Sequence, residues 1–224
     1  MNYRSAIANA ISSLNLMFGV LSVFATFEGE YKTAAVMIVL AVVADSLDGR
    51  AARALGVSGE FGKELDSLCD VCSFGVAPGI LIYQYALMDI GLAGKLLAAF
   101  FAVCGALRLA RFNVNAAVVH GYFVGMPIPA GGCIVSAYIL SGYQFPVEIV
   151  AVGTAIVAVI MYSEIKFPDF KGKGNPMYPA PVVISVAAGL YLLYMRPVAW
   201  PFVIMFTYTM AGIINHIYVK ATNK

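Results

Sequence analysis

Four aspartates are the residues of this chain whose type and position point most directly to chemistry. Asp45, Asp48, Asp66 and Asp70 lie within or at the ends of apolar stretches long enough to cross a membrane. An ionised side chain at a bilayer centre costs about 2.5 to 3.5 kcal/mol, so four uncompensated carboxylates would cost roughly 10 to 14 kcal/mol. Carboxylates that converge on a cation avoid this cost, and hard oxygen ligands suit Mg²⁺, Mn²⁺ or Ca²⁺. The aspartates therefore predict a divalent metal site.

Helical spacing divides these residues between two faces. At about 100° per residue, one face of about 140° on the first helix carries Asp45, Asp48, Gly49, Ala52 and Arg53. A face of about 80° on the next helix carries Gly62, Asp66 and Asp70. The short connector contains the helix breakers Gly56 and Gly59, so we expect antiparallel helices whose acidic faces converge.

The other residues on these faces suit a diphosphate ligand. Gly49 and Gly62 lack side chains and so permit the close approach of a bulky anion. Arg53 supplies a fixed, forked cation that matches phosphate oxygens. Three or four carboxylates can hold two ions a few Å apart, an arrangement used in phosphoryl chemistry. The pattern favours a two-metal site that binds a diphosphate.

The same residues match a family signature. The segments DSLDGRAAR (residues 45–53) and GKELDSLCD (residues 62–70) resemble the CDP-alcohol phosphotransferase pattern D-x-x-D-G-x-x-A-R, about eight residues, then G-x-x-x-D-x-x-x-D. All eight signature positions are filled. The resemblance implies that Asp45, Asp48 and Asp66 bind the metals and that Asp70 binds metal and also acts as general base. It further implies that the nucleotide site, from which CMP leaves, is lined by Gly49, Arg53 and Gly62.

The first helix carries a weaker match. Residues 8–15, ANAISSLN, resemble the P-N-x-x-T-x-x-N stretch with which many members contact the nucleotide, but Ala8 replaces Pro and Ser12 replaces Thr. The resemblance implies that the CDP-activated lipid contacts Asn9, Ser12, Asn15 and also Ser58. The alternative is that these polar residues serve as a helix cap with interhelical contacts.

The acceptor alcohol must be selected by residues outside the shared signature. Arg108 and Arg111 share a helical face and could bind an amino acid carboxylate or a polyol phosphate, or anchor the helix at lipid headgroups. RLARFN (residues 108–113) and GMPIP (residues 125–129) resemble segments of the phosphatidylserine synthase branch of the family. That resemblance implies an L-serine acceptor recognised by Arg108, Arg111 and Asn113. The alternative acceptors are glycerol phosphate and inositol phosphate.

A membrane ion transporter is the alternative from another class of function. It would also place carboxylates inside the membrane. It does not account for glycine, alanine and arginine at the signature positions Gly49, Ala52, Arg53 and Gly62, and we find no repeated halves in the sequence. The enzyme interpretation therefore explains more of the pattern.

Composition sets the fold class. Of the 224 residues 61% are hydrophobic and 12% are charged, with a mean hydropathy of +0.85, which indicates an all-α polytopic membrane bundle. The net charge of +2 is small and scattered, so nucleic acid is not an expected partner. We expect a single domain over residues 1–224, with a catalytic core at about 1–165 that contains the family's six helices. Apolar runs predict eight spans, near residues 8–27, 33–56, 60–87, 92–112, 127–142, 147–164, 179–195 and 198–218. The fifth and sixth are short, so the alternative is six or seven spans with re-entrant or interfacial pieces.

Charge predicts the orientation of these spans. With eight spans and the N-terminus inside, eleven of the fourteen Lys and Arg residues fall at inner ends. Both termini and the active site are therefore expected to face the cytoplasm from the cell membrane. The family resemblance also implies a homodimer, with small residues available for helix contacts.

Overall fold

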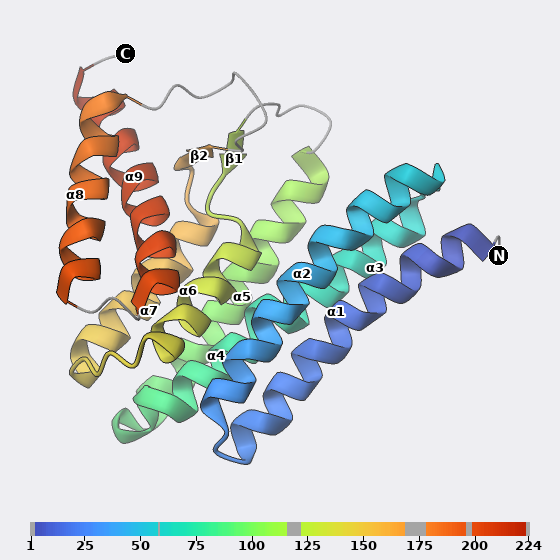
Figure 1. Ribbon diagram of the computed structural model, residues 1–224, viewed down its shortest axis with the longest axis horizontal. Coiled ribbons are helices and arrows are strands. Elements are labelled where there is room, and N and C mark those ends of the chain that lie inside the picture. The colour runs from blue at the N-terminus through green and yellow to red at the C-terminus, as the bar shows by residue number, and fades with distance from the viewer. Residues whose placement is uncertain (1–2, 58, 116–121, 169–177, 196–198, 223–224) are drawn as a thin grey trace.

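The computed structural model describes residues 3–57, 59–115, 122–168, 178–195 and 199–222. These residues form a bundle of helices with one short β-ladder (Figure 1). Its elements are α1 (Tyr3–Phe27), α2 (Tyr31–Leu55), α3 (Glu60–Asp70), the π-helix η1 (Val71–Val76), α4 (Ala77–Ile82), the π-helix η2 (Tyr83–Leu87), the 3₁₀-helix η3 (Met88–Ile90), α5 (Leu92–Asn115), β1 (Tyr122–Val124), α6 (Ile128–Ser141), α7 (Val147–Tyr162), β2 (Lys166–Pro168), α8 (Pro179–Met195) and α9 (Trp200–Thr222).

The predicted helices are confirmed. Because α3 through η3 run on without a break, the described residues contain eight helical rods, and each coincides with one predicted span to within five residues at either end. The predicted break between the second and third spans is also present. Gly56 ends α2 with a φ of +64°, which a residue with a side chain rarely adopts, and α3 begins three residues after Val57.

The third rod changes its winding directly after Asp70. Residues 71–76 form a π-helix, and Pro78 follows in the first turn of α4. Proline has no N–H to close an α-helical hydrogen bond, and π-helical turns inside α-helices are rare and frequently lie at functional sites. Asp70 therefore lies at a junction of two helical geometries.

Small residues bring neighbouring rods close together. A Cβ added to Gly79 would lie 2.8 Å from the carbonyl oxygen of Ala98 on α5, and one added to Gly105 would lie 2.7 Å from Cδ1 of Ile128 on α6. Such close approach is typical of membrane helices, where packing replaces the hydrophobic effect as the force between helices. The contact at Gly79 fixes α5 beside the rod that carries Asp66 and Asp70.

The sequence patterns did not predict the ladder between β1 and β2. Phe123 pairs with Phe167 in an antiparallel register, and Gly125 N–H donates to the Ile165 carbonyl next to it, at 2.8 Å. Helices α8 and α9 pack on each other, and α9 also contacts α6 and β2. Figure 1 shows the ladder, the α2–α3 connection and both chain ends at one end of the bundle, opposite the α1–α2 turn.

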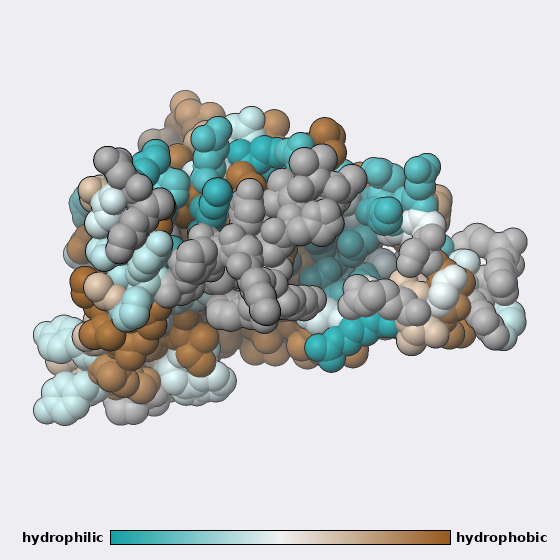
Figure 2. Space-filling model, turned by 90° about the horizontal axis from the view of Figure 1, so that it is seen from above, coloured by the Kyte–Doolittle hydropathy of each residue, from teal (hydrophilic) through white to brown (hydrophobic). Residues whose placement is uncertain are grey.

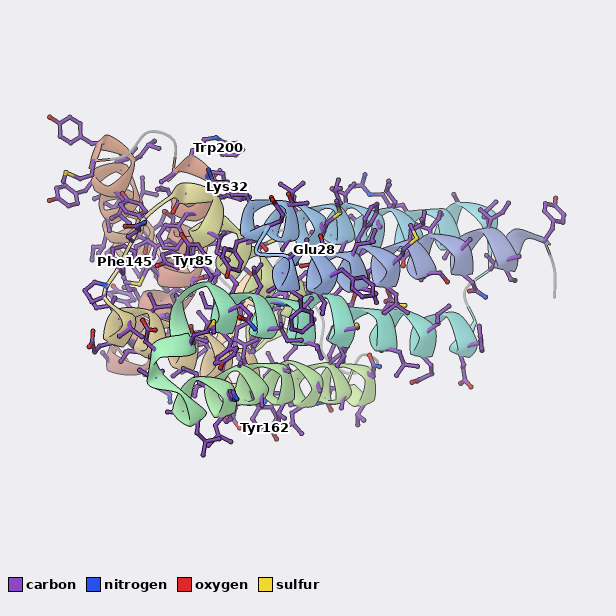
Figure 3. The ribbon with its side chains drawn as sticks, turned by 90° about the horizontal axis from the view of Figure 1, so that it is seen from below. Glu28, Lys32, Tyr85, Phe145, Tyr162 and Trp200 are labelled. Atoms are coloured by element: carbon purple, nitrogen blue, oxygen red, sulfur yellow. The ribbon has the colours of Figure 1, made fainter. Side chains whose placement is uncertain are left out.

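The two ends of the bundle differ in character. Seen from above, the end that holds the ladder shows groups of hydrophilic residues in its upper and right-hand parts, while hydrophobic residues lie mostly at the lower left (Figure 2). Near the opposite end, Tyr85 and Phe145 lie close together, while Glu28 and Lys32 mark the α1–α2 turn (Figure 3). The ring of Tyr138 links the two aromatic residues, with centroid distances of 5.9 Å to Tyr85 and 5.8 Å to Phe145. Aromatic clusters of this kind suit a membrane–water interface.

Length and composition identify an integral membrane protein. Within the described residues, four helical stretches are long and apolar enough to cross a membrane, namely Ser5–Phe27, Glu60–Ile90, Leu92–Asn115 and Trp200–Thr222. Three shorter helices, α6, α7 and α8, are apolar too. The 25-residue α2 is long enough to span but contains Asp45, Asp48 and Arg50. The expected all-α polytopic bundle is confirmed.

Candidate metal and acceptor site

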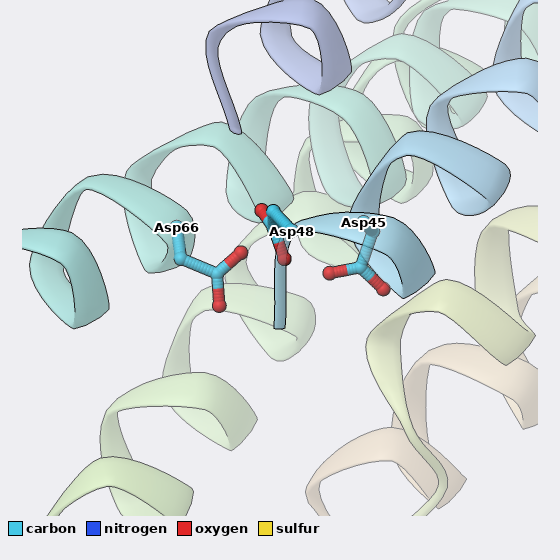
Figure 4. Close-up of side chains that lie close together, drawn as sticks. All are labelled: Asp45, Asp48 and Asp66. Carbon is cyan, nitrogen blue, oxygen red and sulfur yellow. The ribbon is translucent and has the colours of Figure 1, made fainter. Parts of the chain in front are cut away.

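Three carboxylates converge between α2 and α3. Asp45 and Asp48 extend from α2 and Asp66 from α3, and their side chains point towards one another (Figure 4). One oxygen from each residue lies within 4.8 Å of the others. Asp48 is buried, while Asp45 and Asp66 are half-buried. The two acidic faces that helical spacing predicted thus meet in space.

The geometry of these carboxylates fits a divalent cation. An oxygen of Asp48 and an oxygen of Asp66 lie within 4.8 Å of one another, and Oδ1 of Asp66 is buried without a hydrogen-bond donor. Two carboxylates this close repel one another unless a proton or a cation lies between them. The cluster offers only carboxylate oxygen, which is the ligand that Mg²⁺ and Mn²⁺ prefer.

Asp70 lies one helical turn beyond Asp66 and outside the set of three. It is 6% exposed and interacts electrostatically with Asp45, Asp48 and Asp66. Its Oδ1 accepts a hydrogen bond of 2.9 Å from Nδ2 of Asn15. A carboxylate beside a cluster of possible metal ligands is also placed to exchange a proton with a bound substrate.

The predicted nucleotide face of α1 lies against this cluster. Ser12 donates from Oγ to Oδ2 of Asp48 at 2.7 Å, and Asn15 donates to Asp70. A Cβ added to Gly62 would lie 3.6 Å from Oδ1 of Asn9. The interhelical polar contacts that were the alternative interpretation of this face are therefore present for Ser12 and Asn15.

Gly49, Arg53 and Ser58 are the remaining residues that were predicted to contact the CDP-lipid. Gly49 follows Asp48 directly on α2 and is half-buried. Arg53 belongs to the last turn of α2, but its side chain lies outside the described part of the chain, and Ser58 lies outside the described residues altogether.

Arg108 is a buried cation near the carboxylates. It is 4% exposed, and its guanidinium lies over two aromatic rings, 5.0 Å from the centroid of Phe112 and 5.9 Å from that of Phe123. Its Nε is buried with no hydrogen-bond partner, and the group interacts electrostatically with Asp70 and with Tyr208 of α9. A desolvated guanidinium with an unused donor is suited to bind an anionic group of a ligand.

Arg111 instead uses its donors within the protein. Its guanidinium donates to the carbonyl oxygens of Tyr162 at 2.9 Å, Val124 at 3.2 Å and Ser163 at 2.7 Å, and lies 4.8 Å from the Tyr162 ring centroid. It therefore joins the end of α5 to β1 and to the end of α7. Gly125 makes room for this contact, because a Cβ there would lie 2.9 Å from Nη2.

Replacing Arg111 with alanine should lower thermal stability. Three carbonyl oxygens would lose a charged donor, so we expect the free energy of unfolding to fall by about 2 to 4 kcal/mol. The melting temperature of the detergent-solubilised protein would measure this, with Lys95→Ala, an exposed cation on the first turn of α5, as control. Equal melting temperatures for the two variants would contradict the structural role.

Asn113 lies beside the acidic helix. Its Nδ2 donates to Oγ of Ser67, the residue after Asp66, at 2.8 Å. Two residues that sequence reasoning missed also take part in the site: Ser73, which donates to the Asn15 carbonyl at 2.9 Å, and Tyr208. Ser73 follows the signature by three residues, and Tyr208 lies in a helix with no motif, so neither carries a sequence signal.

The fold and the site together define an integral membrane protein with a cluster of carboxylates that could hold a metal ion. Comparison with known families shows which class of membrane protein this is. The model of the family described as CDP-alcohol phosphatidyltransferase matches residues 5–167. The chain belongs to this family. Enzymes of this family generally depend on a divalent metal, which agrees with the acidic cluster.

Three relatives with known names are similar to this chain over most of its length. A CDP-diacylglycerol–serine O-phosphatidyltransferase of Helicobacter pylori (strain J99) is 34% identical over 218 residues, which cover 94% of this chain and 91% of that protein. The enzyme of the same name from Bacillus subtilis (strain 168) is 39% identical over 172 residues, 76% of this chain and 93% of its own length. An archaetidylserine synthase of Methanothermobacter thermautotrophicus is 40% identical over 172 residues, 75% of this chain and 72% of its own.

Proposed function

We propose that this protein transfers the phosphatidyl-type group of a CDP-activated lipid to the hydroxyl of L-serine and releases CMP, as a step of phospholipid synthesis. The observation that carries the proposal is the convergence of three signature carboxylates beside Asp70, with the buried cation Arg108 close enough to Asp70 to interact with it electrostatically. The serine-directed activities in the names of the relatives support the choice of acceptor.

In this proposal Asp45, Asp48 and Asp66 hold two divalent ions, Mg²⁺ or Mn²⁺, with Asp70 as a further ligand. Such ions supply neutralisation of the diphosphate charge when bound. Gly49 and Gly62 leave space for the diphosphate, and Arg53 pairs with its oxygens. Asn9, Ser12 and Ser58 line the rest of the CDP-lipid site.

Asp70 acts as the general base. The serine hydroxyl oxygen attacks the phosphorus that bears the lipid, and a carboxylate oxygen of Asp70 takes the hydroxyl proton. The bond from that phosphorus to the CMP oxygen breaks, and CMP leaves with the electron pair. Because an alcohol is a poor nucleophile at neutral pH, removing its proton during the attack accelerates the step.

Arg108 binds the carboxylate of serine, and Asn113 borders the same region. Arg111, also predicted to recognise serine, supports the acceptor site from the contacts it makes with backbone carbonyls. This leaves one buried guanidinium for the ligand, which suits a singly charged carboxylate better than the doubly charged phosphate of glycerol phosphate or inositol phosphate.

Arg108→Ala should raise the KM for serine by about 10- to 100-fold, because hydrogen bonds to a charged group contribute about 1.5 to 3 kcal/mol. The KM for the CDP-lipid should stay unchanged. Steady-state CMP release at varied serine would measure this, with Lys95→Ala as the matched cation control. A serine KM equal to that of the unsubstituted protein would refute the role of Arg108.

CMP release from purified protein across a panel of alcohols tests the proposed function. We expect L-serine to support release in the presence of a divalent ion, and glycerol phosphate and inositol phosphate to support little. Parallel assays with CDP-diacylglycerol and with its ether-linked isoprenoid analogue would show which of the two lipids is the substrate. Absence of release with every alcohol would rule out the enzyme and favour the transporter.

We also propose that the site and both termini face the cytoplasm and that the protein is a homodimer. The charge bias of the sequence supports the orientation, and Figure 1 shows the chain ends at the end of the bundle that holds the ladder. Labelling from outside the cell, of a single cysteine introduced in the α1–α2 turn, tests the orientation, and cross-linking in native membranes tests the homodimer. Protection of that turn from the label would contradict the orientation. Detection of the monomer alone would contradict the homodimer.

A further inference from the structure

We infer that Asn15 is a positioning residue that fixes the carboxylate of Asp70 for proton transfer from the acceptor. The inference rests on the proposed function and assigns a role to α1, the helix that packs against both α2 and α3. It differs from the nucleotide contact that the sequence pattern predicted for Asn15.

The hydrogen bond between the two side chains is the first support. Asn15 is completely buried, and its Nδ2 donates to Oδ1 of Asp70 at 2.9 Å. Asp70 is 6% exposed. A donor on Oδ1 sets the plane and the rotamer of the carboxylate and leaves Oδ2 as the oxygen that takes the proton. Buried hydrogen bonds to a charged acceptor are short and directional, which makes them effective at holding geometry.

The backbone of Asn15 is anchored to the same segment. Ser73, in the π-helix that follows Asp70, donates from Oγ to the Asn15 carbonyl at 2.9 Å. Gly19, one turn further along α1, permits this approach, since a Cβ there would lie 2.8 Å from the Cα of Ser73. Asn15 is thus tied to Asp70 on one side of the α3–η1 junction and to Ser73 on the other.

These contacts leave little of Asn15 for a nucleotide. Its Nδ2 is engaged with Asp70, its carbonyl with Ser73, and its side chain has no exposed surface. Oδ1 is the one side-chain atom without a partner, and it is buried too. The donor side of the amide therefore acts within the protein, on the base.

Asn15→Leu should lower kcat for serine-dependent CMP release by about 100-fold, since misplacing a catalytic group by 1 Å can cost about that factor. The KM for the CDP-lipid and the affinity for CMP, measured by calorimetry with Mg²⁺ present, should stay within about twofold. Ser22→Ala is the matched control. Ser22 lies two turns along the same face of α1, is fully buried, and its Oγ has no partner, so kcat should not change.

Asn15→Asp provides a second variant of the same shape, in which a carboxylate replaces the donor and repels Asp70, and it should lose at least as much kcat. A loss of CMP affinity with kcat retained would show that Asn15 binds the nucleotide and would overturn the inference. Unchanged kcat in both variants would overturn it as well. If the unsubstituted protein releases no CMP with serine while still binding CMP, the proposed function is wrong, and this inference falls with it.

Asp70→Glu gives an independent check, because it keeps the carboxylate but moves it one methylene further from the backbone, away from the position that the hydrogen bond from Asn15 fixes. If Asn15 acts through Asp70, adding Asn15→Leu to Asp70→Glu should lower kcat by less than threefold, instead of the full factor of about 100. A full additional loss would show that Asn15 acts independently of the base and would contradict the inference.

Discussion

Asp70→Asn is expected to lower kcat for serine-dependent CMP release by about 10³-fold, the middle of the range for general base catalysis. The amide has the shape of the carboxylate but cannot accept the hydroxyl proton. Asp45, Asp48 and Asp66, whose oxygens lie within 4.8 Å of one another, remain in this variant, and the amide oxygen of asparagine can still serve as a neutral ligand, so binding of the CDP-lipid should largely persist. CMP release and CDP-lipid binding measured on the same preparation separate the two effects.

Asp89→Asn is the matched control for this substitution. Asp89 is exposed in η3, at the far end of the same helical rod, and its replacement should leave both quantities unchanged. Full activity of Asp70→Asn would exclude its role as base. Loss of CDP-lipid binding together with activity would instead place Asp70 among the residues that hold the substrate.

Removal of divalent ions should abolish activity. The diphosphate charge would then be left unneutralised beside three carboxylates, and metal ions contribute several kcal/mol to such reactions, so we expect a loss of at least about 10³-fold. Treatment with a chelator followed by graded addition of Mg²⁺, Mn²⁺ or Ca²⁺ measures the effect and ranks the ions.

Asp66→Asn sharpens this test, because it removes charge at the residue whose Oδ1 is buried without a donor. The metal concentration for half-maximal activity should rise by at least about tenfold. Glu64→Gln, an exposed acidic residue two positions earlier on α3, should not change it. Full activity after chelation, or equal metal dependence of the two variants, would contradict a metal centre in this cluster.

The sequence predicted the parts of the structure that depend on local periodicity. Hydrophobic runs predicted the eight helical rods, because a helix in lipid must be apolar along most of its length. Residue spacing predicted that Asp45 and Asp48 share one helix face and that Asp66 and Asp70 share a face of the next helix. The breaker Gly56 predicted that α2 ends before α3. From these features alone the convergence of the acidic faces could be anticipated.

Contacts between distant segments could not be predicted in this way. Arg111 shares a helical face with Arg108, yet its partners are backbone carbonyls of β1 and of the end of α7, which have no sequence signature. The pairing of Phe123 with Phe167 likewise depends on tertiary packing. Identical residue types three positions apart thus have different surroundings, and helical spacing alone did not separate them.

Isotope transfer from serine tests the central claim most directly. Purified protein would be incubated with CDP-lipid and with L-serine labelled with ¹⁸O in its hydroxyl group, and the masses of both products would be measured by mass spectrometry. Attack by the serine hydroxyl on the lipid-bearing phosphorus predicts that the lipid product retains the label and that one unlabelled CMP forms for each serine consumed. A lipid product without the label, or CMP formed at the same rate without serine, would contradict the proposed reaction.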